Sequence, residues 1–332
     1  MPLNDSRRGF RRAIHLHFAA VTLCLSACSA KMGAWEENRD SGQLCLGERI
    51  ASLPTTYANG NLVVGASIGG HPVRFILDTG TELTTVTPWV VEHFSLPKIQ
   101  GQAVVTRGVA GSFSANGVRL SNMSLGPVSL DEQLAAVAPL PKLSPTIQNV
   151  IGVLGMDVLA RFGIIFDLRN NKITLYRGGK CTLRSVINTI GFNVVPYHRG
   201  MKGTILLSAV LNGVEIPATL DTGATISAVN IPGAIKSGAS VGSIGTDKVS
   251  GARGFGGSAI NVYLHIFEEF RVGAETLNKK LLAIGDFSVG AARETPEVLL
   301  GLDFLKERQF IVPSEAGFLY TAISIDEIPA HE

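Results

Sequence analysis

The triplet Asp-Thr-Gly occurs twice in this 332-residue chain, beginning at Asp78 and at Asp221. Each aspartate directly follows an alternating apolar stretch, in HPVRFILDTG and in VEIPATLDTG. This alternation is typical of a β-strand, so each carboxylate is carried to a core-like, poorly solvated place. Gly80 and Gly223 carry no side chain, which lets backbone amides approach the acid. One such triplet would be interpreted as a turn; two copies behind matching strands predict a paired role.

Two carboxyls that face each other would share one proton, because both cannot ionise cheaply at contact distance. The ionised member can take a proton from a trapped water molecule while the protonated member donates to a substrate oxygen. The two groups would then titrate as one unit. This chemistry requires the two aspartates to meet in space.

A tandem duplication would bring the triplets together. The segment IGGHPVRFILDTG lies over LNGVEIPATLDTG at a shift of 221 − 78 = 143, and both predict a β-hairpin that ends in the acid. Further on, RGVAGS recurs as RGFGGS at 253 − 107 = 146, and VLGMDVL recurs as LLGLDFL at 299 − 153 = 146. Features that recur in one order at nearly one spacing predict two copies of one lobe.

Composition and spacing together predict an all-β chain with a sizeable core. Of its residues 45% are hydrophobic and 17% charged, 37 are glycine, and aromatic residues are few. Helical patterns are confined to Pro88 to Phe94 and to the segments MDVLARF and LDFLKER. We divide the chain into a signal peptide (1–27), a tether with a first strand (28–60), a first lobe (61–180), a connection (181–203) and a second lobe (204–325).

At these residues the chain resembles aspartic peptidases of the retropepsin and pepsin type. The shared pattern is apolar-apolar-Asp-Thr-Gly followed by an apolar-apolar-Gly loop, here at Gly155 and Gly301, and it covers both halves. The resemblance implies a bilobal aspartic protease fold. Its two tandem retropepsin-like β-barrel lobes would be related by a pseudo-twofold axis, like a retropepsin dimer fused into one chain. It also implies an aspartic endopeptidase that cuts a peptide or protein substrate with Asp78 and Asp221 as the catalytic pair, without metal or cofactor.

The same resemblance implies roles for the residues around the pair. Thr79 and Thr222 would lock the two loops together through bonds from hydroxyl to backbone. The remaining supporting positions are Gly80, Thr81, Gly223 and Ala224. We hypothesise that the Thr81 hydroxyl supports an ionised Asp78 while Asp221 keeps the proton, because the second copy has Ala224 at that position.

By position, the two glycine-rich segments would be flaps that close over a bound peptide, with exposed turns as the alternative. The flap residues would be Arg107, Gly108, Gly111 and Ser112 in the first copy, and Arg253, Gly254, Gly256, Gly257 and Ser258 in the second. Two departures from the pattern stand out. The pepsin flap tyrosine has no obvious counterpart, and Pro313 stands where the first copy has Asp167. Asp157 and Asp303 also recur, and we expect them to cap short helices.

The first residues predict export. Basic SRRGFRR precedes a short apolar run that is too short to cross a bilayer, which is typical of a signal peptide. The run ends in Leu-Ser-Ala-Cys, which resembles a lipobox with Cys28 as the lipidated residue. Either the general or the twin-arginine route would serve. We expect a lipid-anchored, periplasm-facing envelope protein, with the outer membrane favoured.

Removal of residues 1–27 leaves 29 − 4 = 25 basic and 27 − 1 = 26 acidic residues, so charge predicts no nucleic-acid partner. Cys45 and Cys181 flank the first lobe and could pair in an oxidising compartment, or be unrelated thiols. Two further alternatives stay open. The chain could be a non-catalytic peptide-binding lipoprotein that keeps the fold, or it could pair its aspartates across two chains instead of acting as a monomeric pseudo-dimer.

Overall fold

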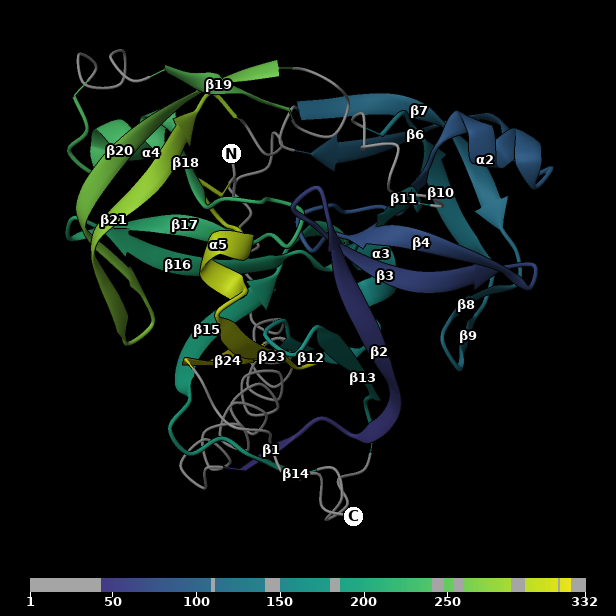
Figure 1. Cartoon of the computed structure of the whole chain (residues 1–332), viewed down its shortest axis with the longest axis horizontal. Helices are drawn as coiled ribbons and strands as arrows, with labels where there is room; N and C mark the ends of the chain where they lie inside the picture. Colours follow the sequence, from purple (N-terminus) through teal and green to yellow (C-terminus); the bar gives the residue numbers. More distant parts are fainter. Residues whose placement is uncertain are drawn as a thin grey trace, which may run out of the picture. The chain divides into compact units, whose positions relative to one another are not determined.

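The computed structural model describes residues 43–108, 111–140, 150–179, 186–240, 248–253, 259–287, 296–315 and 317–323. Over these ranges the protein is mostly β-strand and includes a closed β-barrel (Figure 1). The all-β class predicted from the sequence is confirmed. The signal peptide and residues 28–42 of the tether, which include Cys28, lie outside the described residues.

The described residues fall into two compact units. The smaller contains residues 43–44 and Ile187–Ile190, which include most of two strands that pair with each other, β1 (Gln43–Cys45) and β14 (Val186–Asn188). The larger spans Cys45–Val186 and Gly191–Glu332 and holds both Asp-Thr-Gly triplets.

In the first half of this unit, short strands follow one another with tight turns between them. They are β2 (Glu48–Ala58), β3 (Asn61–Ile68), β4 (His71–Leu77), β5 (Thr85–Val86), β6 (Lys98–Gly108), β7 (Gly111–Leu120), β8 (Met123–Leu125), β9 (Val128–Leu130), β10 (Gln133–Val137), β11 (Val150–Leu154), β12 (Gly163–Asp167) and β13 (Lys172–Arg177). The helices of this half are α2 (Pro88–His93) and α3 (Met156–Leu159).

The second half has a matching set. Its strands are β15 (Asn193–Arg199), β16 (Ile205–Leu211), β17 (Val214–Leu220), β18 (Ala228–Asn230), β19 (Lys248–Arg253), β20 (Ala259–Val272), β21 (Glu275–Gly285), β22 (Val298–Leu300), β23 (Arg308–Val312) and β24 (Gly317–Ile323), with the short 3-10 turn η2 (Met201–Gly203). Its helices are α4 (Ile231–Lys236) and α5 (Leu302–Leu305). The sequence patterns anticipated α2, α3 and α5. They missed α4, which Asn230 caps by accepting from the Gly233 amide at 2.8 Å.

The two halves repeat one scheme of strand pairing. The predicted hairpins are present as β3–β4 and β16–β17. In each half the strand before the acid pairs in parallel with a later strand, β4 with β11 and β17 with β22. That later strand also pairs antiparallel with the short strand after the triplet, β5 or β18. The pairings therefore agree with the duplication inferred from the sequence.

An antiparallel sheet joins the halves. Its order is β2, β13, β12, β23, β24, β15, and its central pair, β12 with β23, brings one strand from each half. These strands gather in the lower centre of Figure 1. The hairpin that has drifted in sequence around Pro313 is thus kept as the antiparallel pair β23–β24. Because the sheet is shared, the larger unit is one body, and the lobe boundaries and the pseudo-twofold axis stay predictions.

The core at this junction is aromatic. Phe166 on β12 and Phe310 on β23 lie opposite each other in register, and their rings stack with centroids 4.3 Å apart at 10°. Neither side chain is exposed to solvent. Stacked rings of this kind bury large apolar areas, so the contact between halves depends on packing as well as on strand hydrogen bonds.

We therefore predict that Phe310→Ala lowers the free energy of unfolding by about 3–5 kcal/mol, the usual cost of emptying a buried aromatic site. Denaturant unfolding monitored by circular dichroism measures it. The control is Ile266→Ala at an exposed position of β20, which we expect to change stability by less than about 0.5 kcal/mol. Equal effects of the two substitutions would contradict this account of the junction.

Candidate active site

Each triplet is fixed at its start by a strand from later in its own half. The Asp78 amide donates to the Leu154 carbonyl at 3.1 Å, and the Asp221 amide donates to the Leu300 carbonyl at 2.9 Å. The residue after Leu154 and the residue after Leu300 are both glycine, because a side chain would collide with the neighbouring backbone. A Cβ on Gly155 would lie 2.8 Å from the carbonyl carbon of Leu83, and one on Gly301 would meet the Ile226 backbone at 2.6 Å. The repeated apolar-apolar-Gly pattern therefore anchors the acid-bearing loop.

Thr79 and Thr222 join the two loops. The Thr79 hydroxyl donates to the Leu220 carbonyl at 2.7 Å, and the Thr222 hydroxyl donates to the Leu77 carbonyl at 2.8 Å. Each hydroxyl also accepts the other threonine's backbone amide at 3.0 Å. Both residues are fully buried. These are the bonds from hydroxyl to backbone that the family resemblance implied.

The lock brings Asp78 and Asp221 together. A Cβ placed on Gly80 would lie 2.5 Å from the carboxyl carbon of Asp221, and one on Gly223 would lie 2.4 Å from that of Asp78. Each glycine therefore packs directly against the opposite acid, where no larger residue fits. The two carboxyls therefore lie close together, and the charge of Asp78 raises the pKa of Asp221.

Backbone amides hold each carboxyl in the same way. Asp78 Oδ1 accepts from the amides of Gly80 and Thr81 at 2.8 and 3.0 Å. Asp221 Oδ1 accepts from the amides of Gly223 and Ala224 at 2.9 and 3.0 Å. On each acid these amides donate to Oδ1. The two halves differ in the donors available to Oδ2.

Thr81 makes the pair asymmetric. Its hydroxyl donates to Asp78 Oδ2 at 2.6 Å, whereas Ala224 has no hydroxyl to offer Asp221. Burial raises the pKa of both carboxyls, and the bonds from Thr81 and Gly80 oppose this rise at Asp78. At Asp221, burial and then the charge of Asp78 hold the pKa well above its ordinary value. The arrangement therefore favours an ionised Asp78 beside a protonated Asp221.

The prediction that Asp157 and Asp303 cap short helices is wrong. The N-caps of α3 and α5 are Gly155 and Gly301, and neither helix has a side-chain cap. Asp157 Oδ1 instead accepts from the amide and hydroxyl of Thr84 at 2.9 and 2.8 Å. Asp303 Oδ1 accepts from both groups of Ser227. These hydroxyls, at 84 − 78 = 6 and 227 − 221 = 6 residues after the acids, were a signal that the sequence reasoning missed.

The described residues of the two segments predicted as flaps lie on paired antiparallel strands. In β6–β7 the backbone of Arg107 lies opposite Ser112 and Gly108 opposite Gly111. In β19–β20, Arg253 lies opposite Ala259. Both hairpins lie on the upper side of the view in Figure 1. Gly254, Gly256, Gly257 and Ser258 lie outside the described residues, and contact of either hairpin with a substrate stays a prediction.

The described residues bear on the cysteines, on metal binding and on membrane-spanning helices. Cys45 is disulfide-bonded, but Cys181 lies outside the described residues, so their pairing stays a prediction. Within the ranges that the structure describes, no group of His, Cys, Asp and Glu side chains is arranged to hold a metal ion. None of the helices in those ranges is long and apolar enough to cross a membrane.

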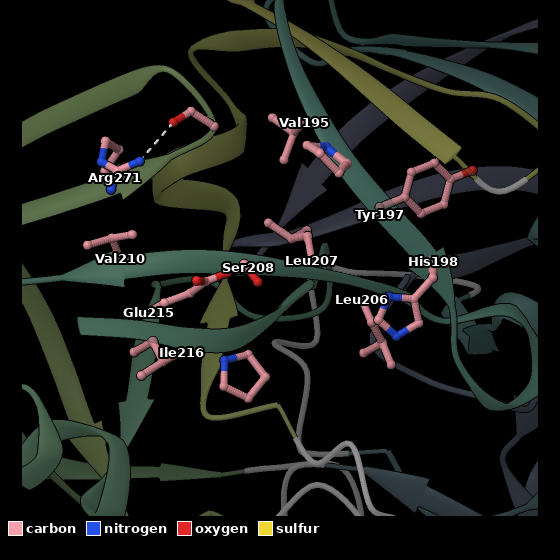
Figure 2. A pocket seen from close by; sticks show the side chains of 13 residues that line it. Val195, Tyr197, His198, Leu206, Leu207, Ser208, Val210, Glu215, Ile216 and Arg271 are labelled. Carbon is pink, nitrogen blue, oxygen red and sulfur yellow. Dashed lines mark hydrogen bonds between the residues drawn. The ribbon is translucent and has the colours of Figure 1, made fainter. Parts of the chain in front are cut away.

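A separate hollow of about 790 Å³ opens on the second half (Figure 2). It is lined by β15, β16, β17 and the end of β20, with Tyr197, Ser208, Glu215 and Arg271 among its side chains. The lining contains no residue of either Asp-Thr-Gly loop. The hollow is therefore distinct from the carboxyl pair.

Comparison with known proteins points to the first Asp-Thr-Gly loop and the residues around it. Residues 64–158, which include Asp78, Thr84, Gly155 and Asp157, match the model of a family described as aspartyl protease. No curated protein matches the chain.

Buried acids make stability depend on pH in a defined direction. Burial raises the pKa of Asp157, although the bonds from Thr84 oppose the rise. An acid whose folded-state pKa lies above its unfolded value binds more protons when folded, so it disfavours the fold progressively as pH rises through that window.

We therefore predict that Asp157→Asn becomes more stable relative to the parent protein as pH rises from 4 to 7, because the amide keeps an acceptor for Thr84 without a charge. Urea unfolding at both pH values measures this difference. Asp303→Asn is the matched control, since it breaks an ion pair with Lys280 and should cost stability at pH 7. A stability difference for Asp157→Asn that stays constant between pH 4 and 7 would contradict the prediction.

Proposed function

On the premise that the first half of the chain is an aspartyl protease domain of retropepsin-like type, we propose that the protein is an aspartic endopeptidase. The observation that carries the proposal is the contact between Asp78 and Asp221 from equivalent loops of the two halves. A pair of carboxyls in one buried place is the arrangement that activates water and protonates a substrate oxygen within the same site.

The asymmetry of the pair suggests a role for each acid. Asp78, supported by the Thr81 hydroxyl, is the base that takes a proton from the attacking water. Asp221 carries the shared proton and donates it to the oxygen of the scissile carbonyl. The backbone amides on Oδ1 of each acid hold both carboxyls in place throughout, so little reorganisation is needed.

The substrate that fits this chemistry is an extended peptide, with hairpins β6–β7 and β19–β20 closing over it as flaps. We further propose that the mature protein is a monomer tethered to the envelope membrane through Cys28 and facing the periplasm. These steps rest on the sequence patterns at Cys28 and at the two glycine-rich segments. The competing function is a peptide-binding lipoprotein without turnover, and the intact state of both aspartates and both loop glycines favours catalysis.

We predict that Asp78→Asn and Asp221→Asn each lower peptide cleavage by at least about 1,000-fold, since removal of either acid destroys the shared-proton chemistry. Casein cleavage between pH 3 and 7 measures it, with the folded state of each variant verified by circular dichroism. The proposal fails in favour of the binding function if the parent protein and both variants behave alike. A specific activity that falls steeply on dilution would instead indicate pairing between two chains.

The Thr81 bond yields a separate prediction. Thr81→Ala removes a donor to the ionised form of Asp78, so the acid limb of the pH profile of kcat/KM should move to higher pH by about one unit, the value of one charged hydrogen bond. The matched variant, Ala224→Ser, supplies a hydroxyl at the equivalent position of the second loop. It should lower the upper pKa of the pair instead. An acid limb that stays in place in Thr81→Ala would remove the assignment of Asp78 as the base.

A further inference from the structure

Lys280 lies outside both Asp-Thr-Gly loops, but it forms an ion pair with Asp303, which contacts the second loop. The Nζ of Lys280, in the middle of β21, lies 3.1 Å from Oδ2 of Asp303 in the first turn of α5. The two side chains are only 22% and 25% exposed. Partly buried pairs are screened by salt much less than exposed ones. This ion pair is therefore screened less than an exposed pair such as Arg119 with Glu132, as is the more deeply buried pair of Arg308 with Glu275.

Asp303 connects Lys280 to the loop that holds Asp221 through hydrogen bonds with two neighbours. We call the three residues Ser227, Gly301 and Asp303 the second bracket. Asp303 Oδ1 accepts from the amide and the hydroxyl of Ser227, each at 2.6 Å. The Ser227 oxygen in turn accepts from the Gly301 amide at 3.0 Å.

The bracket leads to the acid in two more hydrogen bonds. The amide of Leu302, which follows Gly301, donates to the Ala224 carbonyl at 2.8 Å. The Ala224 amide donates to Asp221 Oδ1 at 3.0 Å. An unbroken series of contacts thus runs from Lys280 to the carboxyl of Asp221.

The first half has the same bracket without the lysine. Thr84, Gly155 and Asp157 repeat the contacts of the second bracket. Strand register shows which residue stands in place of Lys280. Ala136 pairs with Thr85 as Ala283 pairs with Ala228, so Lys280, three residues before Ala283, corresponds to Gln133.

Gln133 cannot pair with Asp157 as a cation would. Its side-chain oxygen accepts from the Arg161 guanidinium, and Arg161 Nε donates to the backbone carbonyl of Asp157 at 3.1 Å. The two halves therefore brace equivalent loops differently. In the first half Gln133 and the Arg161 guanidinium reach the backbone carbonyl of Asp157, whereas in the second half an ammonium group pairs directly with the carboxylate of Asp303.

The difference matters because the loops hold their acids differently. In the first loop the Thr81 hydroxyl donates a hydrogen bond to Asp78, whereas in the second loop Ala224 can donate to Asp221 only from its backbone amide. We propose that Lys280 is a positioning residue that fixes the Asp221 carboxyl from outside the loop, through Asp303 and the second bracket. It compensates for the hydroxyl that the second loop lacks. This inference rests on the proposed peptidase function and adds to it the residue that holds the acid member of the pair.

The test is Lys280→Met. It keeps the length of the side chain and removes the charge, so kcat for a peptide substrate should fall about tenfold while KM stays within about twofold, because small misplacements of a reacting group mainly affect the chemical step. Lys280→Arg should restore at least half of the lost rate, since a guanidinium can still pair with Asp303. Lys236→Met is the matched control. It removes a lysine of the same half that pairs with Glu297 at 3.6 Å, and it should leave kcat unchanged.

Hydrogen exchange followed by mass spectrometry makes the test independent of turnover. In Lys280→Met the amides of residues 221–227 should exchange faster than in the parent protein, while those of residues 78–84 should not change. An unchanged kcat in Lys280→Met would overturn the inference, and so would faster exchange spread over both loops with kcat and KM altered together. If the parent protein cleaves no peptide, the proposed function fails. The bracket is then judged by exchange alone, and no local increase in residues 221–227 would refute it.

Discussion

Two acids buried against each other are the constraint on which the rest of this structure depends. Asp78 and Asp221 could not both be charged in these positions, because burial raises the pKa of each carboxyl and the charge of Asp78 raises that of Asp221 further. The surroundings make the contact unavoidable. Glycines 80 and 223 leave room only for the opposite carboxyl, and Thr79 and Thr222 tie the loops across the junction.

The larger architecture serves this contact. Parallel pairing of β4 with β11 and of β17 with β22 places each acid at the end of a strand, and the backbone bonds to Leu154 and Leu300 fix it there. The sheet that passes through β12 and β23 then holds the two halves in one body. The two halves thus supply similar loops, and small differences such as Thr81 against Ala224 give the two acids different hydrogen-bond partners.

Much of this could be predicted from the sequence because it is written in local patterns. Alternating apolar residues before each acid predicted hairpins β3–β4 and β16–β17, and the recurring motifs predicted their duplication. The short helix α4 was missed because Gly233 and its length of six residues leave little helical period, although Asn230 followed by Pro232 is a sequence signal for the start of a helix.

The long-range contacts could not be predicted in the same way. Asp157 stands at the start of a helix, where a capping role was the simpler interpretation, but its partner Thr84 is 157 − 84 = 73 residues away. The bond between Lys280 and Asp303 likewise depends on the register of β21 against β18, which no local pattern gives. Side chains that reach across the fold carry the differences between the halves, and these are what sequence periodicity leaves undetermined.

The most direct measurement is the crystal structure of the protein with a pepstatin-type peptide inhibitor, whose hydroxyl imitates the tetrahedral intermediate of peptide hydrolysis. We expect that hydroxyl to lie between the carboxyls of Asp78 and Asp221 of a single chain, within hydrogen-bond distance of both. An inhibitor bound elsewhere on the surface, or held between aspartates of two different chains, would contradict the intramolecular pair.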